Sequence, residues 1–110
     1  MIRGAIWDVV VDLRQGSPHF GRHLQIELSA ANWKQLWIPV GFGHAFCSIE
    51  PNSEIIYKAT ARYDPDSERG IIWDDPDLAI DWPLAARAPV LSERDQRFPR
   101  LKDVPAYFRY

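Results

Sequence analysis

Few of the features that mark disulfide-stabilised, membrane-spanning or nucleic-acid-binding proteins occur in this sequence. Its single cysteine, Cys47, excludes an internal disulfide and a zinc site built from paired thiols. No apolar run approaches the roughly 20 residues that a membrane-spanning helix needs, and the first residues lack the charged-then-apolar pattern of a signal peptide. The net charge is −2 and basic residues form no run, which argues against nucleic acid and anionic membranes as partners. We therefore expect a soluble, cytoplasmic protein.

Motifs for binding metals, nucleotides and cofactors are also scarce. There is no glycine-rich phosphate loop and no dinucleotide fingerprint. His19 and His23 have the i, i+4 spacing of a metal site on a helix, but Pro18 and Gly21 disfavour a helix there. Cys47 has no candidate base close in sequence, so its default role is that of a small core residue. The sequence predicts no metal and no cofactor.

The chain is rich in segments that favour β-strands. Its 110 residues fit one small domain, and 46% of them are hydrophobic, which is too many for a disordered chain. Many short segments with period-two alternation predict an all-β fold, a jelly roll or a similar double sheet. Short helical turns are expected near the C-terminus, with Ser92 as N-cap and Asp95 at the third position. We predict strands at 4–13, 23–28, 34–38, 41–49, 53–63, 71–73 and 78–82.

Two of these segments have faces of mixed chemistry. In 53–63, Tyr57 and Tyr63 are six residues apart, so an unbroken strand places both phenol rings on one face. In 4–13, Asp8 and Asp12 share a face with apolar side chains, where a carboxylate is costly unless it is hydrogen-bonded or paired. Arg14 or the backbone of a neighbouring strand could satisfy these carboxylates. We interpret both aspartates as architectural.

Five separated stretches of the sequence carry a family resemblance. They are 8–14 (DVVVDLR) with 17–21 (SPHFG), 38–46 (IPVGFGHAF), 57–63 (YKATARY), 73–83 (WDDPDLAIDWP) and 91–95 (LSERD). Their order and spacing resemble the dTDP-4-dehydrorhamnose 3,5-epimerase family, which consists of cofactor-free nucleotide-sugar epimerases. The resemblance covers nearly the whole chain, from about Arg3 to Leu101. It implies a cupin-type jelly roll, a dTDP-4-keto-6-deoxy sugar as substrate, and a dimer whose subunits share strands.

The resemblance also implies that part of the family's domain is absent. The chain begins inside what resembles a mid-domain strand, so we expect 1–110 to be one partial domain, the last three-fifths of the family's. In the family the catalytic base is a histidine in an Arg-Gly-Leu-His segment, and no such segment occurs in this sequence. Open strand edges and uncovered apolar surface would favour a homodimer or an assembly with another chain.

Two catalytic residues are implied by the resemblance. Tyr57 matches the family's proton donor, and a phenol is protonated at neutral pH and can deliver its proton to a carbanion-like centre. Asp95 matches the aspartate that forms a dyad with the family's base, where a carboxylate fixes the tautomer of the imidazole. The structural alternatives are a core tyrosine bonded to a carbonyl for Tyr57 and a carboxylate near a short helix N-terminus for Asp95.

Four substrate-binding residues are implied in the same way. His44 matches a histidine near the diphosphate, and the glycines around Phe42 would let a ligand approach the backbone. Arg94 matches a basic position at the diphosphate, where a guanidinium fork suits phosphate oxygens. Tyr63 matches an aromatic residue that lines the sugar and nucleotide site, and Glu68 matches a substrate contact. The structural alternatives are a core histidine, a solvated arginine, a rim aromatic and a surface turn residue.

These matches predict a role in epimerising C3 and C5 of dTDP-4-dehydro-6-deoxy-D-glucose, in dTDP-L-rhamnose biosynthesis for surface polysaccharides. Because the base is absent, we expect the chain alone to turn over weakly or not at all. The main alternative is a non-catalytic nucleotide-sugar-binding or assembly remnant of the family. The next alternative is a related keto-sugar 3-epimerase or 3,4-ketoisomerase. A metal-dependent cupin ranks last, because no His-x-His with a following acid is present.

Overall fold

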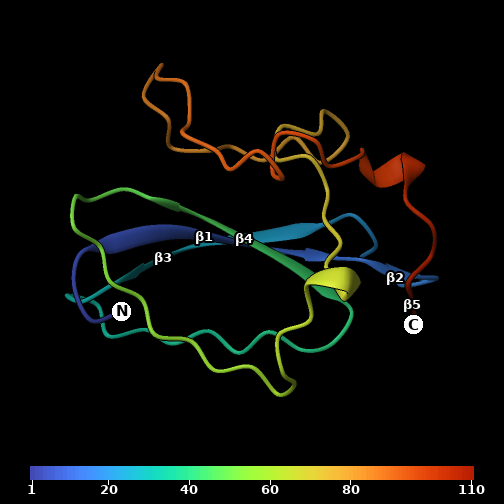
Figure 1. The fold of residues 1–110 in the computed structure, drawn as a ribbon, viewed down its shortest axis with the longest axis horizontal. Coiled ribbons are helices and arrows are strands. Elements are labelled where there is room, and N and C mark those ends of the chain that lie inside the picture. The colour runs from blue at the N-terminus through green and yellow to red at the C-terminus, as the bar shows by residue number, and fades with distance from the viewer.

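The computed structural model describes residues 1–110 and is built around one three-stranded antiparallel sheet (Figure 1). β1 (Ala5–Asp12) is the central strand, with β3 (His23–Ser29) on one side and β4 (Phe42–Ser48) on the other. β2 (Arg14–Gln15) pairs in parallel with β5 (Phe108–Arg109). Two 3-10 turns, η1 (Pro65–Ser67) and η2 (Leu101–Asp103), complete the elements. No helix is long and apolar enough to cross a membrane.

β1 lies at the centre because its sequence suits a strand that is enclosed on both edges. Its β-branched side chains pack well on a pleated surface. Ile6 and Val9 are 2% and 0% exposed. Val9 lies opposite Gln25 on β3 and Ala45 on β4 in the antiparallel register. Because successive side chains alternate, the sheet has two faces with different surroundings.

One face of the sheet, which we call the covered face, packs against the C-terminal part of the chain. Val9 and Val11 of β1 form the core with Leu78. Figure 1 shows the yellow-to-orange segment that follows η1 running above the sheet. Buried Asp75 ties this segment down, since its carboxylate accepts hydrogen bonds from the backbone N–H groups of Asp77 (2.8 Å) and Leu101 (2.7 Å). Partly buried side chains complete the core: Trp7, Leu13, Ile71, Ile80, Trp82 and Leu101.

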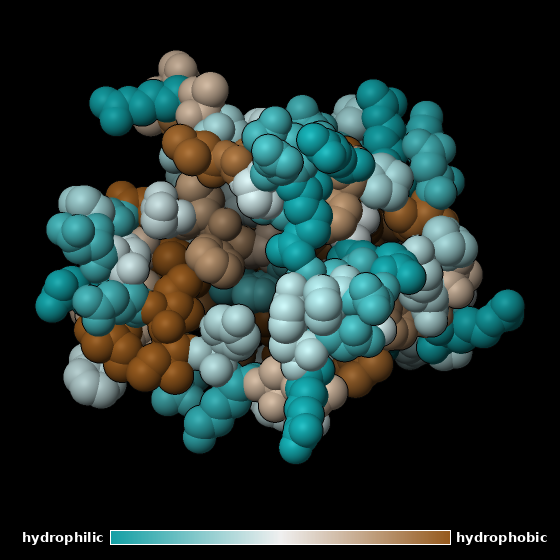
Figure 2. Space-filling view, in the orientation of Figure 1, coloured by the Kyte–Doolittle hydropathy of each residue, from teal (hydrophilic) through white to brown (hydrophobic).

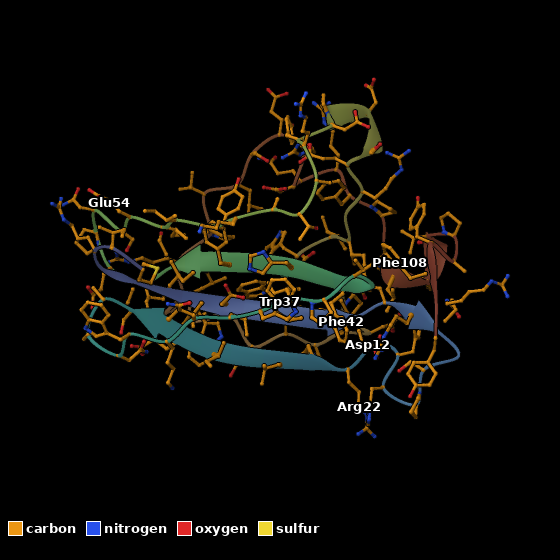
Figure 3. The ribbon with its side chains drawn as sticks, turned by 90° about the horizontal axis from the view of Figure 1, so that it is seen from below. Asp12, Arg22, Trp37, Phe42, Glu54 and Phe108 are labelled. Atoms are coloured by element: carbon orange, nitrogen blue, oxygen red, sulfur yellow. The ribbon has the colours of Figure 1, made fainter.

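The opposite face, which we call the open face, carries Asp8, Val10 and Asp12 of β1. The strand register adds side chains from β3 and β4, and two of these, Leu24 and Phe46, are 54% and 50% exposed. The segment 33–40 passes over part of this face (Figures 1 and 3) and encloses a cavity of about 350 Å³. Figure 2 shows apolar atoms reaching the molecular surface between hydrophilic side chains. The exposed apolar side chains include Leu24, Trp33, Trp37, Val40, Phe46, Ile56, Tyr57 and Tyr63.

Arg14 joins the sheet to the C-terminal strand. Its Nε and Nη2 atoms donate hydrogen bonds to the two carboxylate oxygens of Asp12, at 2.9 and 2.7 Å. The guanidinium carbon lies 4.6 Å from the ring centre of Phe42 and 4.9 Å from that of Tyr110. Figure 3 shows Asp12, Phe42 and Phe108 gathered at this end of the sheet, with Glu54 at the other end. Of the two partners considered for the aspartates, Arg14 is the one that pairs with Asp12.

The all-β prediction is confirmed, and so are three of the predicted strands. The strands expected at 4–13, 23–28 and 41–49 occur as β1, β3 and β4, each within one residue at either end. The turn after Ser92 is also present, because Ser92 Oγ accepts a hydrogen bond from the backbone N–H of Asp95 at 3.1 Å. η2 agrees with the helical turns expected near the C-terminus. β5 was not predicted, since it pairs with β2, which is distant in the chain.

The strands predicted at 34–38, 53–63, 71–73 and 78–82 are wrong. Residues 55–63 and 34–38 make no backbone–backbone hydrogen bond, and Glu54 alone forms an isolated bridge, with Arg3. Period-two alternation describes which way side chains point, but a ladder also needs a partner strand, and none lies beside these segments. In 71–82 the chain instead forms turns, with backbone bonds from Asp75 to Ile72 and from Leu78 to Asp75.

Candidate functional site

A histidine and a carboxylate meet on the open face. His44 lies directly opposite Val10, and Asp8 precedes Val10 by two residues, so both side chains project from the same face. His44 Nε2 lies 2.9 Å from Asp8 Oδ2. The Asp8 side chain is 4% exposed, whereas that of His44 is 39% exposed. A buried carboxylate therefore holds a histidine ring that solvent and ligands can reach.

The glycines beside His44 serve the packing of the chain. At Gly41 (φ +96°), a Cβ atom would lie 2.6 Å from Arg14 Cγ. At Gly43, a Cβ atom would lie 2.9 Å from Leu13 Cδ1. Both distances are too short for a real contact, so a larger residue would displace the Arg14 side chain at Gly41 or the end of the Leu13 side chain at Gly43. The glycine pattern thus has a structural explanation that does not need a ligand.

Three of the predicted site residues form one polar cluster. Tyr63 Oη donates a hydrogen bond to Glu68 Oε2 at 3.1 Å, and Arg94 Nη1 pairs with the same oxygen. Tyr63 and Glu68 are separated by η1, and Arg94 approaches from a distant segment. We call this set the Tyr63–Glu68–Arg94 cluster. Tyr63 and Arg94 are exposed and Glu68 is partly buried, so the two exposed side chains can exchange internal bonds for bonds to a ligand.

The turn at η1 brings Glu68, its C-cap residue, back to Tyr63. Asp64 caps η1, because its carboxylate accepts a hydrogen bond from the backbone N–H of Asp66 (3.1 Å) and another from the Ser67 hydroxyl. The Ser67 hydrogen bond lowers the pKa of Asp64, with the Asp66 backbone N–H as the second cause. Pro65 at the first position of the turn supplies the fixed φ that favours this geometry. The residues 64–67 therefore explain, through their local turn, why Glu68 lies close to Tyr63.

Tyr57 and Asp95, the two predicted catalytic residues, are not brought into contact. No hydrogen bond links them, and Tyr57 is 84% exposed on the unpaired segment 55–63. Neither residue lines the cavity under 33–40 or the cavity of about 360 Å³ between Trp73 and Leu84. Their assignment as a catalytic pair stays a prediction.

Asp8 is the site residue whose role the sequence did not reveal. It was interpreted as architectural together with Asp12, but it contacts His44, which is 36 residues away in the chain. The sequence indicated only that Asp8 lies on one face of an alternating strand. It did not indicate that β4, which carries His44, pairs with that strand. No group of three or more His, Cys, Asp or Glu side chains could hold a metal ion.

Comparisons with known proteins agree on one family. The family model described as dTDP-4-dehydrorhamnose 3,5-epimerase matches residues 1–103. The dTDP-4-dehydrorhamnose 3,5-epimerase of Sinorhizobium fredii is 45% identical over 108 residues, which are 98% of this chain and 55% of that protein. The chain spans about half the length of the curated relatives that it matches.

Solved structures extend the similarity to the fold. The rmlC epimerase of Mycobacterium tuberculosis matches with a TM-score of 0.89 and 40% identity, over 93% of this chain and 52% of that one. The RmlC of Legionella pneumophila, in complex with dTDP-4-keto-L-rhamnose, matches with a TM-score of 0.84 and 38% identity, over 99% of this chain and 58% of that one. The expected cupin-type fold is confirmed by these matches.

Proposed function

We propose, from the premise that this chain belongs to the dTDP-4-dehydrorhamnose 3,5-epimerase family, that it forms the proton-donating and substrate-binding part of a keto-sugar epimerase site. The observation that carries this proposal is the Tyr63–Glu68–Arg94 cluster, in which three residues matched to the family's substrate contacts meet at one carboxylate oxygen. The Legionella pneumophila relative is described with dTDP-4-keto-L-rhamnose bound. We infer that the ligand of this chain is a dTDP-4-keto-6-deoxy sugar.

The proposed reaction moves protons without any change in oxidation state. A base removes the proton from a carbon next to the ketone, and the electron pair of that C–H bond passes into an enolate. An acid then returns a proton to the same carbon from the opposite face, first at C5 and afterwards at C3. Tyr57 is the proposed acid, because a phenol carries a proton at neutral pH. Its exposed ring leaves it accessible to a substrate.

Within the cluster, Arg94 is proposed to bind the diphosphate. A guanidinium offers several donors in one plane, and one of them, on Nη1, is already directed to Glu68. Phosphate oxygens suit the remaining donors. Tyr63 offers an aromatic surface at the same place, which suits stacking against a nucleobase or sugar ring. Glu68 would then hold both side chains in position for the ligand.

The base is proposed to come from outside this chain. The three histidines of the sequence are His19, His23 and His44, and none of them forms a hydrogen bond with Asp95. In the family resemblance, the base lies in an Arg-Gly-Leu-His segment, which this sequence lacks. Loss of a general base typically lowers a rate by about 10²–10⁴-fold. We therefore propose that the chain alone binds its ligand and turns it over weakly or not at all.

We further propose that the chain works as a dimer or as an assembly with another polypeptide. β3 and β4 are both edge strands, and the backbone of 55–63 makes no hydrogen bond to other backbone groups. Such backbone groups favour pairing with a strand of a second chain. We place this assembly in the cytoplasm, in keeping with the single cysteine of the sequence.

Solvent exchange tests this function directly. The purified chain is incubated in deuterated water with dTDP-4-dehydro-6-deoxy-D-glucose, and deuterium at C3 and C5 is followed by NMR. We expect little or no uptake by the chain alone, and much faster uptake after addition of a polypeptide that carries the family's Arg-Gly-Leu-His segment. Tyr57→Phe should abolish that uptake, whereas Tyr107→Phe, at another exposed tyrosine, should not. Equal uptake by the Tyr57→Phe variant would refute the assignment of the acid.

The second candidate function is nucleotide-sugar binding without catalysis. The observation that favours it is that no hydrogen bond joins Tyr57 to Asp95 and that neither residue lines the two cavities described above. This alternative predicts binding of dTDP but no deuterium uptake with any added polypeptide. The exchange experiment therefore separates the two candidates.

A further inference from the structure

We propose that Asp8 is a positioning residue for His44: it fixes the tautomer and the orientation of the imidazole so that Nδ1 is the atom presented to a ligand. The proposal stands on the 2.9 Å contact between His44 Nε2 and Asp8 Oδ2 on the open face. The part of the proposal that concerns ligand binding by Nδ1 rests on the function proposed above. The part that concerns the tautomer of His44 is independent of that function.

The fold gives Asp8 little freedom to move. It lies in the middle of the central strand and has a register partner on each side, Ile26 on β3 and Phe46 on β4. Its residue exposure is 3%. A carboxylate enclosed in this way is a rigid support for a more exposed ring. His44 lies in an edge strand and is the more exposed member of the pair, and the contact with Asp8 orients its ring.

The chemistry of the pair decides which ring nitrogen carries hydrogen. An ionised carboxylate can only accept hydrogen bonds, so the nitrogen that faces it must be a donor. Nε2 of His44 therefore carries hydrogen in both the neutral and the protonated ring. Nδ1 has no partner within the chain and is left for the ligand. A fixed tautomer set by a neighbouring carboxylate is a common way of orienting a functional histidine.

Comparison with Asp12 shows that packing alone does not account for Asp8. Both aspartates lie on the same strand and the same face, and both are 3% exposed. Both oxygens of Asp12 are satisfied, by Arg14 and Ser17. Asp8 has one oxygen on His44, and its Oδ1 is buried without any hydrogen-bond partner. A buried acceptor without a partner is unfavourable for stability, so the residue is better explained by its action on His44 than by stabilising the sheet.

The first test measures the tautomer of His44 in the unaltered chain by nitrogen-15 NMR of the histidine rings. The chain has three histidines, so the His19→Gln, His23→Gln and His44→Gln variants assign the signals. We expect hydrogen on Nε2 of His44 in the neutral ring. A neutral ring with hydrogen mainly on Nδ1 would overturn the proposal. This measurement needs no change at Asp8, so it decides the question even if variants at Asp8 fail to fold.

The second test compares Asp8→Asn with the matched control Asp12→Asn. An asparagine at position 8 can donate its amide N–H to Nε2, which permits the opposite tautomer. We expect the Nδ1–H form of His44 to appear in Asp8→Asn and to stay absent in Asp12→Asn, although both variants lose stability. Histidine signals in Asp8→Asn that match the unaltered chain would overturn the proposal.

The third test uses dTDP as the probe and titration calorimetry as the readout. We expect His44→Gln and Asp8→Asn each to weaken dTDP binding by about tenfold. Because Asp8 acts through His44, the double variant should bind no more weakly than His44→Gln alone. Additive losses in the double variant would contradict this. A failure of the unaltered chain to bind dTDP would count against the proposed function, while the tautomer measurement would still decide the role of Asp8.

Discussion

Arg14 shows how one side chain can link three parts of this chain. Its fork engages both oxygens of buried Asp12, and its flat faces lie against Phe42 and Tyr110. The Arg14 hydrogen bond is the largest cause that lowers the pKa of Asp12 well below its usual range. Removing one partner of such a pair leaves an unpaired buried charge. The guanidinium thus stabilises the junction of β1, β4 and β5.

Loss of Arg14 should destabilise the chain and change its response to acid. We expect Arg14→Ala to lower the free energy of unfolding by about 3 kcal/mol at pH 7 in urea titrations. Arg14→Lys keeps the positive charge but lacks the planar guanidinium, so its free energy of unfolding should lie between those of the unaltered chain and Arg14→Ala. A lowered carboxyl pKa stabilises the fold above the unfolded value of about 4, and this contribution is lost as the pH falls toward the folded value. The decline of stability below pH 4 should be shallower in Arg14→Ala, and an unchanged decline would refute the pairing.

At the Tyr63–Glu68–Arg94 cluster, a pair of arginines on neighbouring turns allows a matched comparison. Arg94 pairs with Glu68, whereas Arg97 is 78% exposed and lies 3.6 Å from Glu93 in a solvent-exposed pair. We expect Arg94→Ala to weaken dTDP binding by about tenfold or more, because charge-assisted bonds to phosphate are lost. Arg97→Ala should change the affinity by less than about twofold. Calorimetric titrations that show equal losses would exclude a specific role for Arg94.

Among the elements, β1, β3 and β4 were predictable and the segment 53–63 was not, although its alternation is the most regular. The three strands are both patterned and paired within the chain, so local sequence and tertiary structure agree. Tyr57 and Tyr63 lie in a segment that has the pattern but no partner strand. The same limit applies to the site. Glu68 returns to Tyr63 through a local turn, but the contact between Asp8 and His44 depends on a strand register that no local pattern specifies.

The residue before β4, Gly41, allows a test of how tightly the start of this strand packs against Arg14. Gly16 (φ +86°) and Gly41 (φ +96°) both adopt left-handed backbone, so alanine is strained at either position. Only Gly41 has a neighbour within reach, Arg14 Cγ at 2.6 Å, and Asp12 and two rings hold that side chain in place. We expect Gly41→Ala to lower the free energy of unfolding by about 1–3 kcal/mol more than Gly16→Ala. Equal effects in urea titrations would show that Arg14 yields freely.

At the scale of the whole molecule, the difference between the covered face and the open face of the sheet favours association with a second chain. The covered face has its own core, whereas the open face and the segment 55–63 leave apolar side chains and backbone groups exposed. Surfaces of this kind are uncommon on stable monomers. The fold class and the family were accessible from five ordered motifs. The degree of enclosure was not, because it depends on which strands are available to pair.

Sedimentation velocity checks this view of the whole molecule. At micromolar concentration we expect a dimer or a larger species, because the edge strands and the open face favour association. Ile56→Lys places a charge on the unpaired segment, where Ile56 is 69% exposed, and should shift the distribution toward monomer. Val90→Lys, at a fully exposed site outside that segment, serves as the control. A monomer for the unaltered chain would contradict the proposed assembly.

The segment that passes over the open face has an optical consequence. Trp33 and Trp37 are 87% and 78% exposed, whereas the other three tryptophans lie partly buried on the opposite side or in the C-terminal coil. Indole emission shifts to shorter wavelength when water leaves the ring. We therefore expect the emission maximum of Trp33 and Trp37 to shift to shorter wavelength when a ligand or a second subunit displaces water from that side of the molecule.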